Sequence, residues 1–177
     1  EFDSFGILAQ NATHSTFENC TVDGTIISSE EMDDIGGFIG YAEGCTFVDC
    51  TNNADITSEG GNIGGVIGDG NKNTFTNCVN NGDIYADEDE VGGIAGETDY
   101  GIFENCVNNG KISTEDEQAG GIAGNTNTAI FTNCKNYGDI ICISDENSAD
   151  EIGGIVGSAY ESTTITECEN YGTVGNS

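Results

Sequence analysis

The sequence predicts an all-β protein that folds as a parallel β-solenoid of about six coils, each with three short strands. Three observations predict this fold. A phrase of the form Ile-Gly-Gly-Phe-Ile-Gly recurs along the 177 residues at spacings of 28, 28, 28 and 33 residues. No unit contains a 3.6-residue apolar period long enough for a helix. Each unit instead has three short apolar runs separated by Gly, Asn and Asp clusters, which are typical of strands and corners. We expect a right-handed β-helix, since parallel crossover connections are overwhelmingly right-handed.

The repeat divides the chain into six units within one domain that spans residues 1–177. The units occupy residues 4–34, 35–62, 63–90, 91–118, 119–151 and 152–177. Each unit is too short to bury a core alone, so we expect identical positions of successive units to stack and fill one continuous core.

The first element of each unit is the glycine-rich phrase. It occupies residues 35–40, 63–68, 91–96, 119–124 and 152–157, and a degenerate copy begins at Phe5. We expect the paired glycines to lie at a corner or where two backbones approach closely.

The second element ends in a cysteine that recurs at one phase of the repeat, and we expect these residues to form a structural ladder: Cys20, Cys50, Cys78, Cys106, Cys134 and Cys168. Three interpretations are open. Stacked cysteines would have Cα atoms about 4.8 Å apart, which suits a disulfide on distance alone. A metal site would need ligands that converge from different directions, and no paired Cys-x-x-Cys motif occurs. We favour a ladder of buried free thiols that packs the core.

The third element follows an Asn-x-Gly corner. Its first asparagines should stack and hydrogen-bond along the solenoid axis as a second ladder: Asn52, Asn80, Asn108, Asn136 and Asn170. We expect these asparagines and glycines to supply the positive φ that a sharp corner requires.

The charge excludes several classes of function. The chain has 32 acidic residues, three lysines and no arginine, which gives a net charge of −29. Such a surface repels nucleic acid and anionic membranes, and no apolar run of about 18 residues could insert into a bilayer. The termini show no signal peptide or anchor, as expected of a mature product or a piece of a longer protein.

Much of this charge gathers just before the glycine-rich phrase, so that stacking would align it along one side of the solenoid. We call this set the acidic edge: Asp33, Asp34, Asp87, Asp89, Glu90, Glu115, Asp116, Glu117, Asp145 and Glu146. Carboxylates of this kind could bind Ca²⁺, but no EF-hand or calcium nonapeptide motif occurs. We favour a solvated edge that keeps the protein soluble and prevents lateral pairing of sheets. No cofactor is expected beyond loosely associated Ca²⁺.

Catalysis is not expected. A lyase for acidic sugars needs a cationic base, whereas Lys72, Lys111 and Lys135 lie at three different phases of the repeat. A hydrolase needs carboxylates at a fixed separation in a cleft, and no break in the repeat is rich in both carboxylates and aromatic residues. Tyr41, Tyr100 and Tyr160 fall between the first two strands and are candidates for contact with a protein or glycan.

The compound phrase Gly-Gly-x-x-Gly, followed by Asn-Cys-x-Asn-x-Gly-x-Ile, resembles the GLUG repeat. The resemblance is close in units two to five, good in unit six and loose in unit one. It implies a module of bacterial secreted or cell-surface proteins, as in the non-catalytic regions of IgA-specific metallopeptidases. The zinc motif of those peptidases is absent, because His14 is the only histidine.

We therefore expect a non-catalytic extracellular or cell-surface module that acts as an adhesive surface or a stiff spacer. The alternatives are a structural subunit that assembles head to tail and a carbohydrate-binding or calcium-dependent recognition module. Free thiols in an extracellular protein would suit an anaerobic habitat.

Overall fold

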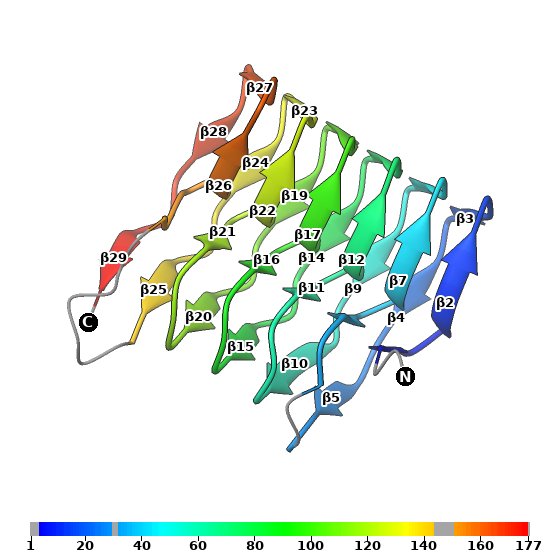
Figure 1. Cartoon of the computed structure of the whole chain (residues 1–177), viewed down its shortest axis with the longest axis horizontal. Helices are drawn as coiled ribbons and strands as arrows, with labels where there is room; N and C mark the ends of the chain where they lie inside the picture. The colour runs from blue at the N-terminus through cyan, green and yellow to red at the C-terminus, as the bar shows by residue number, and fades with distance from the viewer. Residues whose placement is uncertain (1–3, 30–31, 144–150, 177) are drawn as a thin grey trace.

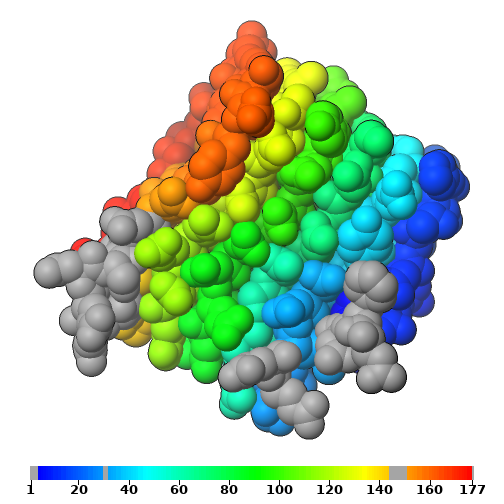
Figure 2. Space-filling view, viewed as in Figure 1, coloured from blue at the N-terminus to red at the C-terminus, as the bar shows by residue number. Residues whose placement is uncertain are grey.

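The computed structural model describes residues 4–29, 32–143 and 151–176, and these residues form a parallel β-solenoid (Figure 1). The described part contains strands, turns and bends but no helix, so it also contains no helix that could cross a membrane. The predicted fold class is confirmed. Successive coils lie side by side from the N-terminal to the C-terminal end, and they form adjacent bands in the space-filling view (Figure 2).

Five parallel sheets run along the solenoid. The first contains β1 (Phe5–Gly6), β6 (Ile35–Gly36), β11 (Ile63–Gly64), β16 (Val91–Gly92) and β21 (Ala119–Gly120). The second contains β2 (Ala9–Thr13), β7 (Ile39–Glu43), β12 (Ile67–Asn71), β17 (Ala95–Asp99), β22 (Ala123–Asn127) and β26 (Val156–Tyr160). The third contains β3 (Thr16–Glu18), β8 (Thr46–Val48), β13 (Thr74–Thr76), β18 (Ile102–Glu104), β23 (Ile130–Thr132) and β27 (Thr164–Thr166).

The remaining two sheets complete each coil. The fourth contains β4 (Thr21–Val22), β9 (Thr51–Asn52), β14 (Val79–Asn80), β19 (Val107–Asn108), β24 (Lys135–Asn136) and β28 (Glu169–Asn170). The fifth contains β5 (Thr25–Ile27), β10 (Asp55–Ser58), β15 (Ile84–Ala86), β20 (Ile112–Thr114), β25 (Ile140–Cys142) and β29 (Val174–Asn176). A single bridge between Gly120 and Gly153 extends the first sheet into the last coil.

The register of these sheets places equivalent repeat positions directly above one another. Phe75 pairs with Phe47 in one direction and with Phe103 in the other. Because the side-chain period of a strand is two residues, this register keeps the same face of every coil inside the solenoid.

Each of the first five coils has five short strands, and the sixth has four strands and a bridge, rather than the three strands per coil that the sequence suggested. Residues in the left-handed conformation interrupt the chain at three places in each coil. One row lies between the second and third sheets (His14, Gly44, Lys72, Tyr100, Thr128 and Glu161), and one lies between the third and fourth (Asn19, Asp49, Asn77, Asn105, Asn133 and Glu167). The third row lies just before the first sheet and comprises Asp34, Asn62, Glu90, Gln118 and Glu151.

The Asn-x-Gly corners turn by a different means than expected. Among the described residues, neither the ladder asparagines nor the glycines two residues later have a φ in the left-handed region. Instead, the side chain of Asn80 donates from Nδ2 to the carbonyl oxygen of Gly82 at 2.8 Å, which closes the turn.

The core consists of two columns of stacked side chains. The larger column contains the phenylalanines of the third sheet, whose ring centroids lie between 4.6 and 5.0 Å apart: Phe17, Phe47, Phe75, Phe103 and Phe131. The smaller column is built mainly from isoleucines of the first and fifth sheets. Stacking of identical side chains therefore supplies the apolar burial that no single unit could supply alone.

The paired glycines mark a close approach between coils. A Cβ atom on Gly65 would overlap the carbonyl oxygen of Gly93 and lie 2.6 Å from Oδ1 of Asn80. The structure bears out both expectations, since the second glycine of each pair also lies in the bend between the first and second sheets, as Gly65 does between β11 and β12.

Candidate functional site

The buried asparagines form one continuous hydrogen-bonded ladder in the fourth sheet. Nδ2 of each residue donates to Oδ1 of the next at 2.7–2.8 Å, through Asn52, Asn80, Asn108, Asn136 and Asn170. The second Nδ2 hydrogen closes the corner on the carbonyl two residues ahead. Because the first four members are completely buried, each of these hydrogen bonds satisfies a polar group that water cannot reach.

The cysteine ladder lies in the larger core column. All eight cysteines are free thiols, and Cys50, Cys78, Cys106 and Cys134 are fully buried. Each of these four thiols donates to a phenylalanine carbonyl of the preceding coil, as Cys106 Sγ does to Phe75 at 3.5 Å. Burial raises the pKa of Cys106 well above its usual range. A thiol held in this way packs the core and is a poor nucleophile.

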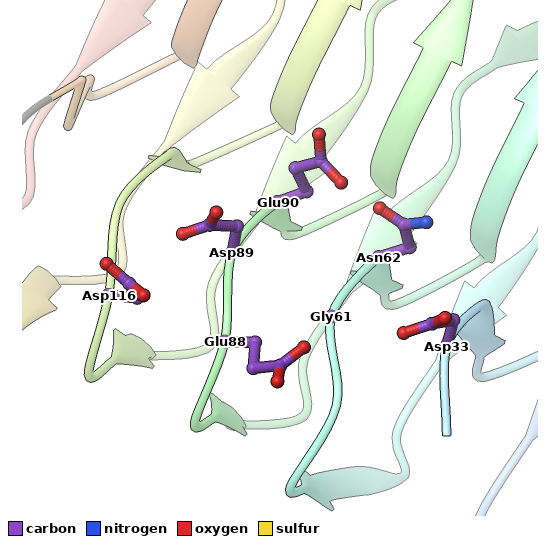
Figure 3. A pocket seen from close by; sticks show the side chains of 7 residues that line it. All are labelled: Asp33, Gly61, Asn62, Glu88, Asp89, Glu90 and Asp116. Carbon is purple, nitrogen blue, oxygen red and sulfur yellow. The ribbon is translucent and has the colours of Figure 1, made fainter. Parts of the chain in front are cut away.

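The acidic edge includes a shallow groove of about 460 Å³ that spans successive coils (Figure 3). Its lining residues are Asp33, Gly61, Asn62, Glu88, Asp89, Glu90 and Asp116. At and beside the groove, Asp34 accepts a hydrogen bond from Asn62 at 3.0 Å, and Asp89 accepts one from the backbone N–H of Glu117 at 2.8 Å. Part of the acidic edge therefore bonds to the neighbouring coil.

Other members of the acidic edge lie apart from this groove. The Tyr85 hydroxyl donates to Oε1 of Glu115 at 2.6 Å, on the side of the fifth sheet. Asp87 follows β15 on the same side. Asp145 and Glu146 lie outside the described residues.

Two carboxylates beside the acidic edge were not predicted from the sequence. Asp69 on β12 and Glu97 on β17 occupy the outer face of the second sheet, next to Asp34 and Glu90. Burial, reinforced by neighbouring carboxylates, raises the pKa of Asp69 to about 6 and that of Glu97 to about 7. The available signal was their position in the sequence, because each of these acids directly follows the last glycine of a glycine-rich phrase, at the same phase in both units.

The described side chains of the groove do not converge on one point as the ligands of a cation would. Figure 3 shows that the groove side chains come from successive coils, with Glu88 and Glu90 pointing in different directions. Across residues 4–29, 32–143 and 151–176, no three His, Cys, Asp or Glu side chains are grouped so that they could hold a metal ion. The described carboxylates are arranged as a strip, which favours diffuse association of cations over coordination of one ion.

The three candidate recognition tyrosines do not form a common surface. Tyr41 lies on β7, half-buried between Asn11 and Asp69 of the flanking strands. Tyr100 is exposed at a left-handed corner, with Nζ of Lys72 5.9 Å from its ring centroid. Tyr160 ends β26 and donates to Glu151 at 3.3 Å.

Comparison with known proteins identifies the repeat. The GLUG motif matches residues 34–57, which cover the second coil from its left-handed corner at Asp34 to β10. No curated protein and no solved structure matches the chain. The GLUG repeat is a structural repeat type, and the same register joins the matched coil to its neighbours through all five sheets. The chain is therefore a β-solenoid whose second coil carries a GLUG motif.

Proposed function

We propose that this solenoid is a non-catalytic module of a bacterial extracellular or cell-surface protein, in which it serves as a stiff spacer or an adhesive surface. The location rests on the GLUG motif, because such repeats occur in secreted and surface proteins. The mechanical role rests on the structure.

The observation that carries the spacer role is the uninterrupted stack. The second to fifth sheets each contain six strands, one from every coil, and the asparagine ladder joins five coils by side-chain hydrogen bonds. In such a stack each coil contacts only its neighbours, so length increases with coil number while the cross-section stays constant. A repeat with these properties is suited to hold other domains at a fixed distance.

The adhesive role is supported by the regular outer faces. One outward row of the third sheet contains Thr74, Ile102 and Ile130 in three successive coils, and both isoleucines are exposed. A flat array of this kind offers repeated contacts to a protein or glycan, whose individual energies add along the array.

Three measurements test these proposals. Antibodies against the chain should label intact cells of the source organism, and labelling only after permeabilisation would contradict the proposed location. Amide hydrogen exchange should be uniformly slow in the second to fifth coils, since rapid exchange there would contradict a stiff spacer. Binding of the immobilised chain to an array of glycans and surface proteins would assign the adhesive role, and an array without binding would leave only the spacer.

A further inference from the structure

A second groove lies apart from the one at the acidic edge, on the outer face of the fifth sheet. Its volume is about 370 Å³, which falls in the range of roughly 300–1,000 Å³ that is usual for small-ligand sites. Its polar lining residues come from the second, third and fourth coils and are Asp55, Thr57, Asp83, Tyr85, Lys111 and Ser113. Each of these coils has a neighbouring coil on both sides, so the groove does not arise from an end of the stack.

The repeat changes its residue types at this groove. Tyr85 pairs in register with Thr57 on one side and with Ser113 on the other, and it is the aromatic residue in a column of small and aliphatic side chains. Lys111 occupies a repeat position that is aspartate in the coils before and after it. A local departure from the repeat that does not serve the stack is expected of a binding position.

The Tyr85 side chain is fixed across the boundary between two coils. Its hydroxyl donates to Oε1 of Glu115, which follows β20 of the next coil, at 2.6 Å. The ring therefore extends from the third coil toward the fourth, where it lines the groove. A ring that is already held in place loses little conformational freedom when a ligand stacks on it.

Two carboxylates of the groove are also held in place, and each keeps one oxygen available. Oδ1 of Asp55 accepts from the backbone N–H of Asp83 at 2.9 Å, and Oδ1 of Asp83 accepts from that of Lys111 at 2.8 Å. The second oxygen of each carboxylate has no hydrogen-bond partner within residues 4–29, 32–143 and 151–176. These oxygens are acceptors for hydroxyl groups of a ligand.

Ser113 supplies a shielded hydroxyl in the same groove. Its neighbours Ile112 and Thr114 are completely buried on the inner face of β20, so Ser113 projects from the outer face. Ser113 is nevertheless only 5% exposed, and its hydroxyl has no partner in the described part of the chain. A hydroxyl that is largely shielded from water and unpaired gains a hydrogen bond when a polar ligand enters.

The charges of the groove select the class of ligand. Asp55 and Asp83 repel an anion, whereas Lys111, which has no ion pair among the described residues, disfavours a cation beside it. An uncharged ligand that carries several hydroxyl groups satisfies both restrictions. A sugar ring has this chemistry, because its hydroxyl groups can donate to the carboxylates while its C–H face packs on an aromatic ring such as that of Tyr85.

We propose that this groove on the fifth sheet binds a short segment of an uncharged glycan, with Tyr85 as the stacking platform and Asp55, Asp83 and Ser113 as hydrogen-bond partners. The proposal rests on the adhesive form of the proposed function, which it deepens by naming the class of partner. It places recognition on a different face from the exposed isoleucines of the third sheet and from Tyr41, Tyr100 and Tyr160.

The test is a titration of the ¹⁵N-labelled chain, followed at the backbone amides of Tyr85, Lys111 and Ser113. The probes are lactose, maltotriose, cellotriose and mannotriose at millimolar concentration, with anionic sialyllactose and the cationic trimer of glucosamine for comparison. We expect at least one uncharged probe to shift these three amides in a saturable way, and neither charged probe to do so more strongly.

Variants then assign the binding to the groove. Tyr85→Ala should weaken the affinity for the uncharged probe at least about tenfold, and Ser113→Ala should weaken it about fivefold. The matched control is Tyr100→Ala, which removes an exposed tyrosine from a different corner and should change the affinity less than about twofold. Thermal unfolding of each variant checks that the solenoid is intact, and Ser113→Ala keeps the test decisive if Tyr85→Ala does not fold.

Three results would overturn the proposal. One is that no uncharged probe shifts the three amides, and another is that only a charged probe shifts them. The third is that an uncharged probe binds with the same affinity to the parent chain, Tyr85→Ala and Ser113→Ala, which would leave the adhesive role in place but move it to another face. Cell labelling and hydrogen exchange in the middle coils do not depend on this groove, so they test the proposed function separately.

Discussion

The ladder asparagines act at the scale of single residues, because each one joins two neighbouring coils and closes its own corner. Asn80 is completely buried, donates to Gly82 and Asn108, and accepts from Asn52. Its amide therefore satisfies three polar partners inside a region that is otherwise apolar. Removal of one amide should cost more than the average hydrogen bond, since its partners stay buried.

We predict that Asn80→Ala lowers the free energy of unfolding by about 3 kcal/mol, because it leaves buried polar groups of three residues without their partner. The matched control is Asn81→Ala, since Asn81 donates to Asn53 at 2.8 Å in a parallel ladder that is exposed to water. This control should cost less than about 1 kcal/mol. Urea denaturation measures both values, and equal losses in the two variants would contradict the role assigned to the buried ladder.

A second residue-scale prediction concerns Glu97, whose pKa is raised to about 7 by burial and by the nearby Glu90 and Asp69. A carboxyl group whose pKa is higher in the folded state stabilises the fold when protonated. Its contribution is therefore fully present below the ordinary value of 4.5 and is lost as the pH rises through about 7. Asp69 behaves in the same way, because its contribution to stability is lost as the pH rises from 3.8 through about 6.

Glu97→Gln should therefore stabilise the protein at alkaline pH, with a difference from the parent chain that grows between about pH 4.5 and pH 8. Because the side chain is only half-buried, we expect a gain on the order of 1 kcal/mol. The control is Glu104→Gln on the exposed face of β18, which removes the same charge at a position away from Glu97 and its neighbouring carboxylates. Urea midpoints across this pH range would contradict the prediction if the two variants gave parallel curves.

At the scale of the elements, the close approach of neighbouring coils restricts the glycine-rich phrase. Gly65→Ala would place a Cβ atom against the backbone of Gly93 and beside Asn80, and neither group can move without disturbing the ladder. We predict a loss of about 3 kcal/mol in the free energy of unfolding. Gly175→Ala is the control, since no atom lies within 4 Å of its added Cβ, and thermal unfolding should show almost no change. A comparable loss in both variants would show that flexibility of glycine matters more than the space between coils.

The parallel stack and the core columns could be predicted from the sequence because they depend on spacing alone, whereas the division of each coil into five strands could not. A constant 28-residue interval brings Phe47, Phe75 and Phe103 into one column in any parallel stack. The corners could not be predicted in the same way. Gly82 looked like a residue chosen for positive φ, but a Cβ there would overlap the carbonyl oxygen of Ala54. A positive φ and a close approach to a neighbouring backbone both favour glycine, so the presence of glycine alone does not show which of the two the fold requires.

The candidate site was harder to predict for a related reason. The acidic edge was recognisable as runs of carboxylates, whereas Asp69 and Glu97 are single acids within the second sheet. Their raised pKa values depend on partial burial beside Asp34 and Glu90, which becomes visible only when the path of the corner is known. Runs of acidic residues in the sequence indicate where carboxylates repel one another, but they do not indicate which carboxylates are buried away from water.

At the scale of the whole molecule, the net charge of −29 opposes the compact state, since folding brings the carboxylates of successive coils together. We predict that the thermal midpoint rises with NaCl concentration, because the screening length falls from about 30 Å at 0.01 M to about 3 Å at 1 M. CaCl₂ and MgCl₂ at equal ionic strength should stabilise to the same extent, as expected of a strip of carboxylates without a coordinating group. A calcium-specific rise in the thermal midpoint at micromolar concentration would contradict this interpretation.

The stacked register also makes a whole coil removable. Deletion of residues 91–118 joins Glu90 to Ala119, and it keeps a left-handed residue before the first sheet because Glu90 has the same conformation as Gln118. Phe75 would then stack on Phe131, and Asn80 would donate to Asn136, in place of their present neighbours.

We therefore predict that this 28-residue deletion folds into a solenoid that is about 4.8 Å shorter, with the same cross-section and a lower free energy of unfolding. Deletion of residues 91–104 is the control, because removal of half a coil places Glu117 over Phe75 and the glycine-rich phrase 119–124 over residues 77–82, which breaks both ladders. Small-angle scattering measures the length, and far-UV circular dichroism reports whether each variant keeps its β-structure. If the half-coil variant folded as well as the whole-coil variant, register between identical side chains could not be what stabilises the stack. A folded whole-coil variant beside an unfolded half-coil variant would instead show that the interval of 28 residues is the property that specifies this fold.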